Sequence, residues 1–107
     1  MAEYRPEEWV LIQIDEDTVK VFAGWRGGYI SSDSWRMNSG IAEVKEDGDY
    51  WLFIGHSGSI YRCRKEYYGI KSPYNESVLV QTKLIAMKHC AALRFIKSKL
   101  KNEKKSN

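Results

Sequence analysis

The segment closest to a catalytic motif is the run of small residues at positions 55–59. A nucleophile elbow needs Gly-x-Ser-x-Gly between a strand and a helix, but here Ser59 stands where the second glycine belongs. Runs rich in β-forming residues flank the segment on both sides, at residues 50–54 and 60–64. The pattern therefore predicts a β-hairpin whose turn carries His56, and no nucleophile.

Other residue types that could do chemistry are not spaced for it. Zinc sites pair their ligands at short intervals such as Cys-x2-Cys, whereas the only close pair here is His89-Cys90, adjacent in a predicted helix. The aspartates fall in predicted turns, where backbone geometry favours this residue type. The glycines around Arg26 lack the Lys-Ser/Thr of a phosphate-binding loop. The sequence thus predicts a non-enzymatic protein with no catalytic residue, metal or cofactor.

Aromatic and basic residues alternate in three stretches of the chain, which contains four Trp and seven Tyr. Trp, Tyr and Arg are enriched at protein-binding hot spots, and the same mixture can stack on bases while neutralising phosphates. The plainer alternative is that the tryptophans belong to the core and the arginines to solvated edges. We expect a binding surface that includes Trp25, Arg26, Tyr29, Trp35, Arg36, His56, Arg62, Arg64 and Lys65.

The two halves of the chain carry opposite charge. Residues 1–59 sum to −6 and residues 60–107 to +9, within a net charge of +3. This asymmetry suits a basic surface for an acidic partner, or two faces that attract each other within or between chains. Nucleic-acid-binding domains typically have a pI above about 9, and the sequence pI here is lower, about 8.8. We therefore expect a protein target, bound by an inhibitor or adaptor module that can form a homodimer, with nucleic acid or a nucleotide as the alternative.

Length and composition indicate one domain over residues 1–107. Hydrophobic residues make up 43% and charged residues 29%, as in ordinary globular proteins. The chain begins with a polar, acidic stretch, and no window is apolar enough for a transmembrane span. Two cysteines far apart in sequence suit a reducing compartment. The expectation is a soluble cytoplasmic protein without membrane contact.

An α+β fold must position these residues. We expect residues 1–8 to be a loose start and residues 9–64 to form one antiparallel meander sheet of five or six strands, open, curled or barrel-like. The apolar run at 50–54 predicts a strand covered on both faces. The strands are expected at residues 9–14, 18–25, 35–37, 41–45, 50–54 and 60–64, with a tight turn at Asp47-Gly48.

One long amphipathic helix is expected to cover this sheet. Residues 65–77 contain Gly69 and Pro73 and predict a loop, in which Asn75 can cap a helix spanning residues 76–100. The helix would present an apolar stripe at Leu84, Met87, Ala91 and Phe95. Residues 101–107 are lysine-rich and predict a basic flexible tail.

Overall fold

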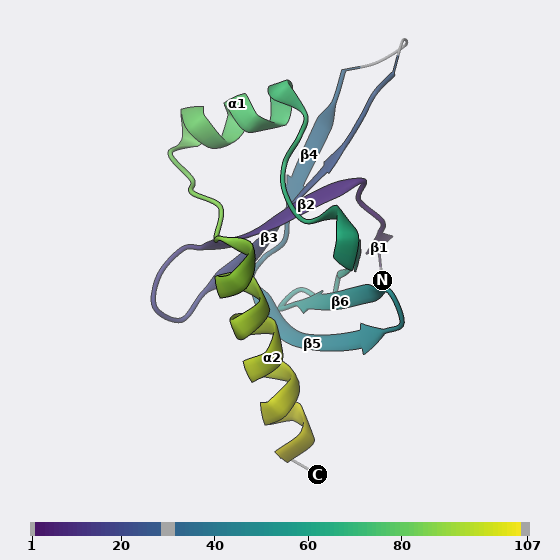
Figure 1. The fold of residues 1–107 in the computed structure, drawn as a ribbon, viewed down its shortest axis with the longest axis vertical. Coiled ribbons are helices and arrows are strands. Elements are labelled where there is room, and N and C mark those ends of the chain that lie inside the picture. Colours follow the sequence, from purple (N-terminus) through teal and green to yellow (C-terminus); the bar gives the residue numbers. More distant parts are fainter. Residues whose placement is uncertain (1, 29–31, 106–107) are drawn as a thin grey trace.

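Two β-sheets and two α-helices make up the part of the chain that a computed structural model describes, residues 2–28 and 32–105. Sheet A has the strand order β1-β7-β6-β5 and sheet B the order β2-β3-β4 (Figure 1). The α+β class is confirmed, but the single predicted sheet is wrong. The elements are β1 (Glu3–Tyr4), β2 (Glu8–Gln13), β3 (Val19–Trp25), β4 (Ser34–Met37), β5 (Ile41–Asp47), β6 (Tyr50–Gly55), β7 (Ile60–Arg64), the 3-10 helix η1 (Lys65–Tyr67), α1 (Pro73–Thr82) and α2 (His89–Lys105).

The chain passes from sheet B to sheet A at residues 38–40. Asn38 continues the ladder of β4, because its N–H donates to the Val21 carbonyl at 3.2 Å and its side-chain oxygen accepts from the Val21 N–H at 2.9 Å. Gly40 then adopts a φ of +125°, a conformation that favours glycine, and leads into β5. The predicted meander is thus divided into two sheets, and the described strands do not close into a barrel.

Sheet B is buried on both faces. Trp9 and Leu11 of β2 point into a core shared with the inner face of sheet A and with α2. Val10 and Ile12 point the other way, into a second core completed by Leu79 of α1. Figure 1 shows α1 and the strands β5 and β6 on opposite sides of β2 and β3. The continuous apolar run of β2 follows from this position, since a strand covered on both faces has no polar side.

Sheet A is buried on one face only. In β6 the side chains of Trp51 and Phe53 are buried in the shared core, whereas Leu52 and Ile54 between them are half-buried on the outer face. The expectation that residues 50–54 are covered on both faces is therefore wrong. Neither core includes Leu52 or Ile54, because neither helix covers the outer face of sheet A. The buried residues of α2 lie in the shared core, and that of α1 lies in the second core.

The predicted helix over residues 76–100 is wrong, because the chain forms two helices separated by an extended segment. Lys83 ends α1 in the left-handed conformation, with φ +59°, and its N–H bonds the carbonyls of Leu79 and Val80. The chain then runs beside β2, where Met87 N–H donates to the Leu11 carbonyl at 2.8 Å. Glycine or asparagine usually marks such a helix end, so Lys83 gave no sequence signal for it.

Helix α2 covers the shared core with one side and leaves the other in solvent. Ala92 and Ile96 are fully buried, and Leu93, Phe95 and Leu100 pack against them. The helix extends to Lys105, into the segment predicted as a tail. Among the described residues, neither helix is long and apolar enough to cross a membrane.

The N-terminal segment is part of the fold and not a loose start. Strand β1 pairs in parallel with β7, and Glu8 at the head of β2 is only 2% exposed. The Glu8 carboxylate accepts hydrogen bonds from the N–H groups of Lys71 and Ser72, at 2.8 and 3.1 Å, and from Asn75 Nδ2 at 2.9 Å. This single buried carboxylate therefore joins sheet B to the start of α1.

Ser72, and not the predicted Asn75, caps α1. The Ser72 hydroxyl accepts the Asn75 N–H at 3.2 Å, while the Asn75 side chain is fully buried and donates to Glu8 and to the Ser34 carbonyl. Gly24 makes this approach possible, since a Cβ at this position would lie 2.6 Å from Asn75 Nδ2 and 2.7 Å from a Glu8 carboxylate oxygen. Asparagine is common at both kinds of position, so only the tertiary structure distinguishes them.

Removing the Glu8 carboxylate should destabilise the protein. We expect Glu8→Ala to lower the free energy of unfolding by roughly 2–4 kcal/mol, because it leaves three buried donors without an acceptor. Glu8→Gln, which keeps the shape, should lose less. Urea denaturation measures the difference, with Glu16→Ala in the exposed β2–β3 turn as the control; equal effects at the two positions would refute the role of Glu8.

The two thiols should differ in reactivity. Burial raises the pKa of the Cys63 thiol well above its ordinary value, whereas Cys90 is exposed in the first turn of α2. Alkylation of the native protein at neutral pH, followed by mass spectrometry, should label Cys90 alone, because the reactive thiolate of Cys63 is neither accessible nor populated. Native labelling of Cys63 at the same rate would contradict the described core.

Candidate functional site

The residues expected to form one binding surface are distributed over several parts of the molecule. Trp25 and Arg36 lie beside Tyr4 at the edge between the sheets, with the Arg36 guanidinium 4.7 Å from the Tyr4 ring centre. Trp35 occupies the opposite face of sheet B and stacks on Phe22, with ring centres 5.2 Å apart. Adjacent strand positions point to opposite faces, so Trp35 and Arg36 cannot serve one contact surface.

His56 has a structural environment. It lies in the β6–β7 turn, exposed, and its backbone N–H donates to the Gly40 carbonyl at 3.0 Å. No carboxylate contacts its imidazole in the described part of the chain, where no group of three His, Cys, Asp or Glu side chains gathers as in a metal site either. Tyr29, the other candidate in a turn, lies outside the described residues.

Lys65 and Arg62 already have acidic partners. Lys65 forms an ion pair with Glu46, and its ammonium group lies 4.3 Å from the centre of the Trp51 ring. Arg62 bonds Asp47 at 2.7 Å and Glu3 at 3.3 Å, so it connects β7 to both outer strands of sheet A. The hydrogen bond to Asp47 raises the pKa of Arg62, which therefore stays charged.

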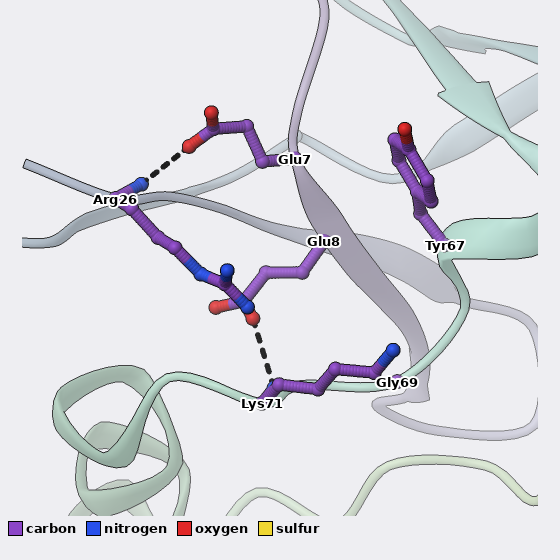
Figure 2. A pocket seen from close by; sticks show the side chains of 6 residues that line it. All are labelled: Glu7, Glu8, Arg26, Tyr67, Gly69 and Lys71. Atoms are coloured by element: carbon purple, nitrogen blue, oxygen red, sulfur yellow. Dashed lines mark hydrogen bonds between the residues drawn. The ribbon is translucent and has the colours of Figure 1, made fainter.

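Arg26 lines a pocket of about 310 Å³ between the start of β2 and the segment that leads to α1. Its N–H donates to Glu7 Oε1 at 2.6 Å, and Figure 2 shows Tyr67 and Lys71 across the pocket. Two acidic and two basic side chains line the space: Glu7, Glu8, Arg26 and Lys71. Glu8 already accepts three N–H groups, whereas the side chains of Arg26 and Lys71 form no ion pair among the described residues.

The outer face of sheet A brings two of the candidate residues, Arg62 and Arg64, onto one surface. We call it the open face. The strand register places Tyr50 opposite Arg64, Leu52 opposite Arg62, and Ile54 opposite Ile60. The neighbouring strands contribute charged residues of both signs, so the whole face comprises Glu3, Glu43, Lys45, Asp47, Tyr50, Leu52, Ile54, Ile60, Arg62 and Arg64. Three apolar side chains at its centre are thus half-buried with no element over them.

Arg64 differs from the other arginines of this face. Its guanidinium lies 5.7 Å from the Tyr50 ring centre and 5.6 Å from that of Tyr67, and it donates to the Tyr50 hydroxyl at 3.3 Å. It forms no ion pair with a carboxylate of the described residues, unlike Arg62. Two aromatic rings therefore hold a cation whose charge remains available to a partner.

Sequence reasoning identified Arg62 and Arg64 but missed the other half of the open face. Tyr50, Leu52 and Ile54 fall in a continuous apolar run, which predicts that both faces of this strand are covered. The alternation in β7 was the available signal, because Ile60 shares a face with Arg62 and Arg64. The strand opposite them must then present its alternate residues on the same face.

Asp33 links the backbone next to Arg26 to Ser72, the residue that caps α1. One carboxylate oxygen accepts the Gly27 N–H at 3.0 Å, and the other accepts the Ser72 hydroxyl. The hydrogen bond from Ser72, followed by that from Gly27, lowers the pKa of Asp33. Its contribution to stability is therefore present above the unfolded pKa of about 3.9 and is lost as the pH falls through the lower folded pKa.

Asp33→Asn should therefore change how the free energy of unfolding depends on pH in the acidic range. We expect the variant to be less stable than the wild type at neutral pH, and the difference to shrink as the pH falls below about 4. Urea denaturation across this range measures it. Asp49→Asn, at a side chain for which no hydrogen bond is described, should follow the wild type; a constant gap for Asp33→Asn would show that its effect is unrelated to ionisation.

Comparison of the chain with known protein families, with curated proteins and with solved structures found no match. The function must therefore be inferred from the surfaces of the chain itself.

Proposed function

We propose that this chain is a non-enzymatic interaction module that binds a protein target through the open face of sheet A. The observation that carries the proposal is the state of Arg64, whose guanidinium lies over the rings of Tyr50 and Tyr67 and forms no ion pair among the described residues. An arginine fixed in this way loses little conformational entropy on binding, so its contact with an acidic group is stronger than that of a free side chain.

The apolar centre of the same face supports this function. Leu52, Ile54 and Ile60 lie side by side and half-exposed, next to Tyr50 and Arg64. An apolar patch beside aromatic residues and arginine is the composition found at the centre of protein interfaces. A target that fits this face has an apolar segment with an acidic residue placed to reach Arg64.

The charge of the open face favours a protein over a nucleic acid. Phosphate binding needs a surplus of cations, but the face has three acidic and three basic side chains: Glu3, Glu43, Asp47, Lys45, Arg62 and Arg64. Arg62, which could contact phosphate, is bound to Glu3 and Asp47. Lys65, near the end of β7, is bound to Glu46.

Capture of the target from lysate of the source organism tests the proposal. We expect Arg64→Glu and Leu52→Asp each to reduce the amount of captured protein at least about tenfold, the effect of a loss of roughly 1.4 kcal/mol at a hot spot. A photoreactive amino acid at position 52 should cross-link the same protein. Circular dichroism establishes that both variants remain folded.

Arg94→Glu is the matched control, since it makes the same charge change on the exposed side of α2. It should leave capture unchanged. If the captured material disappears after nuclease treatment, or if Arg94→Glu weakens capture as much as Arg64→Glu does, the open face is not a protein-binding site.

A further inference from the structure

A second surface, on the side of the molecule formed by α1 and the β2–β3 turn, exposes large apolar side chains. Ile85 is 82% exposed, Val80 68% and Ile14 43%. We call it the Ile85 surface, and it comprises Ile14, Glu76, Val80, Lys83, Leu84 and Ile85. It is distinct from the open face, because sheet B lies between α1 and sheet A.

The local structure explains why Ile85 points outward. After Lys83 the chain is extended, and Ala86 forms a β-bridge with Ile12. Leu84 and Ala86 pack against the core between sheet B and α1, so the alternation of an extended chain turns the intervening Ile85 into solvent. The fold itself therefore fixes an isoleucine as a projecting knob.

A hollow adjoins this knob on each side. The larger, about 370 Å³, lies between Ile85 and α1 and is lined by Glu76, Leu79, Val80 and Lys83 among others. The smaller, about 240 Å³, lies between Ile85 and the end of β2 near Ile14. A cavity of about 150 Å³ accepts benzene, so the larger hollow has room for an isoleucine side chain.

Charge is arranged along α1 so that the Ile85 surface complements itself. Glu76, Val80 and Lys83 follow one another at positions i, i+4 and i+7 and line the same hollow, with the apolar residue between an acid and a base. Neither Glu76 nor Lys83 forms an ion pair within the described residues. Two copies packed antiparallel about a point between Leu79 and Val80 would place each Glu76 against the other copy's Lys83, with Val80 beside the axis.

We infer that two copies of this chain pair through the Ile85 surface about a two-fold axis. A two-fold interface uses the same patch twice, so it requires a knob and a hollow on each copy and opposite charges at equal distances from the axis. The Ile85 surface has all of these: Ile85, the larger hollow, and Glu76 and Lys83 at equal spacing from the midpoint between Leu79 and Val80. The pairing leaves the open face of each copy free.

The test exchanges the charges and measures mass by light scattering and native mass spectrometry over a range of concentrations. The wild type should be a dimer, and Ile85→Asp should weaken it at least about tenfold. Glu76→Lys and Lys83→Glu should each weaken it, because like charges then face each other. An equimolar mixture of these two variants should form a mixed dimer, in which both charge pairs are attractive again.

Asp49→Lys, in the β5–β6 turn of sheet A, and Lys97→Glu, on α2, are at exposed positions away from this surface; both serve as controls and should remain dimers. Thermal melts show whether Glu76→Lys has weakened α1, whose first turn favours an acidic residue. A wild type that is monomeric up to millimolar concentration overturns the inference. So does a dimer that survives Ile85→Asp, a mixture that forms no mixed dimer, or a monomer whose position 85 cross-links a different protein.

Discussion

The structure depends on the burial of sheet B on both faces. Trp9 and Leu11 contribute to the core shared with sheet A, and Val10 and Ile12 to the core under α1, so four consecutive residues of β2 connect every layer. The buried carboxylate of Glu8, at the start of β2, accepts the N–H groups of Lys71 and Ser72 where α1 begins and so ties this sheet to the helix. The positions of α1, of the extended segment after it and of the outward Ile85 all follow.

The same layering explains why two surfaces remain open. Each outer layer has one face against a core and one in solvent. On sheet A the solvent face combines an apolar centre with Arg64 between two tyrosine rings. On the α1 side the solvent face carries Ile85 and Val80 between opposite charges.

The two proposals combine into one picture of function. If two copies join through the Ile85 surface, their open faces lie in the outer layers of the dimer, and each is free to bind a target. Two binding faces on one particle raise the effective concentration of the second contact when the target is itself repeated or dimeric. The opposite charges of the two sequence halves are partly paired within the chain, since Arg62 bonds Glu3 and Asp47 and Lys65 bonds Glu46.

Local sequence patterns determined six of the seven described strands, the hairpin turns and the sides on which Arg62 and Arg64 lie, because alternation and turn chemistry act over a few residues. The short strand β1 was not predicted, since it depends on its pairing with β7. Only the tertiary structure decided which apolar strand is buried on both faces. The strands β2 and β6 have similar sequences, but β2 lies between two cores and β6 borders only one. The tertiary structure also decided that the apolar stripe beginning at Leu84 is not a single helix, because Lys83 adopts a left-handed conformation that the packing of α1 and β2 imposes. The role of Asn75 was ambiguous for the same reason: capping and burial use the same amide, and Glu8, distant in sequence, selects between them.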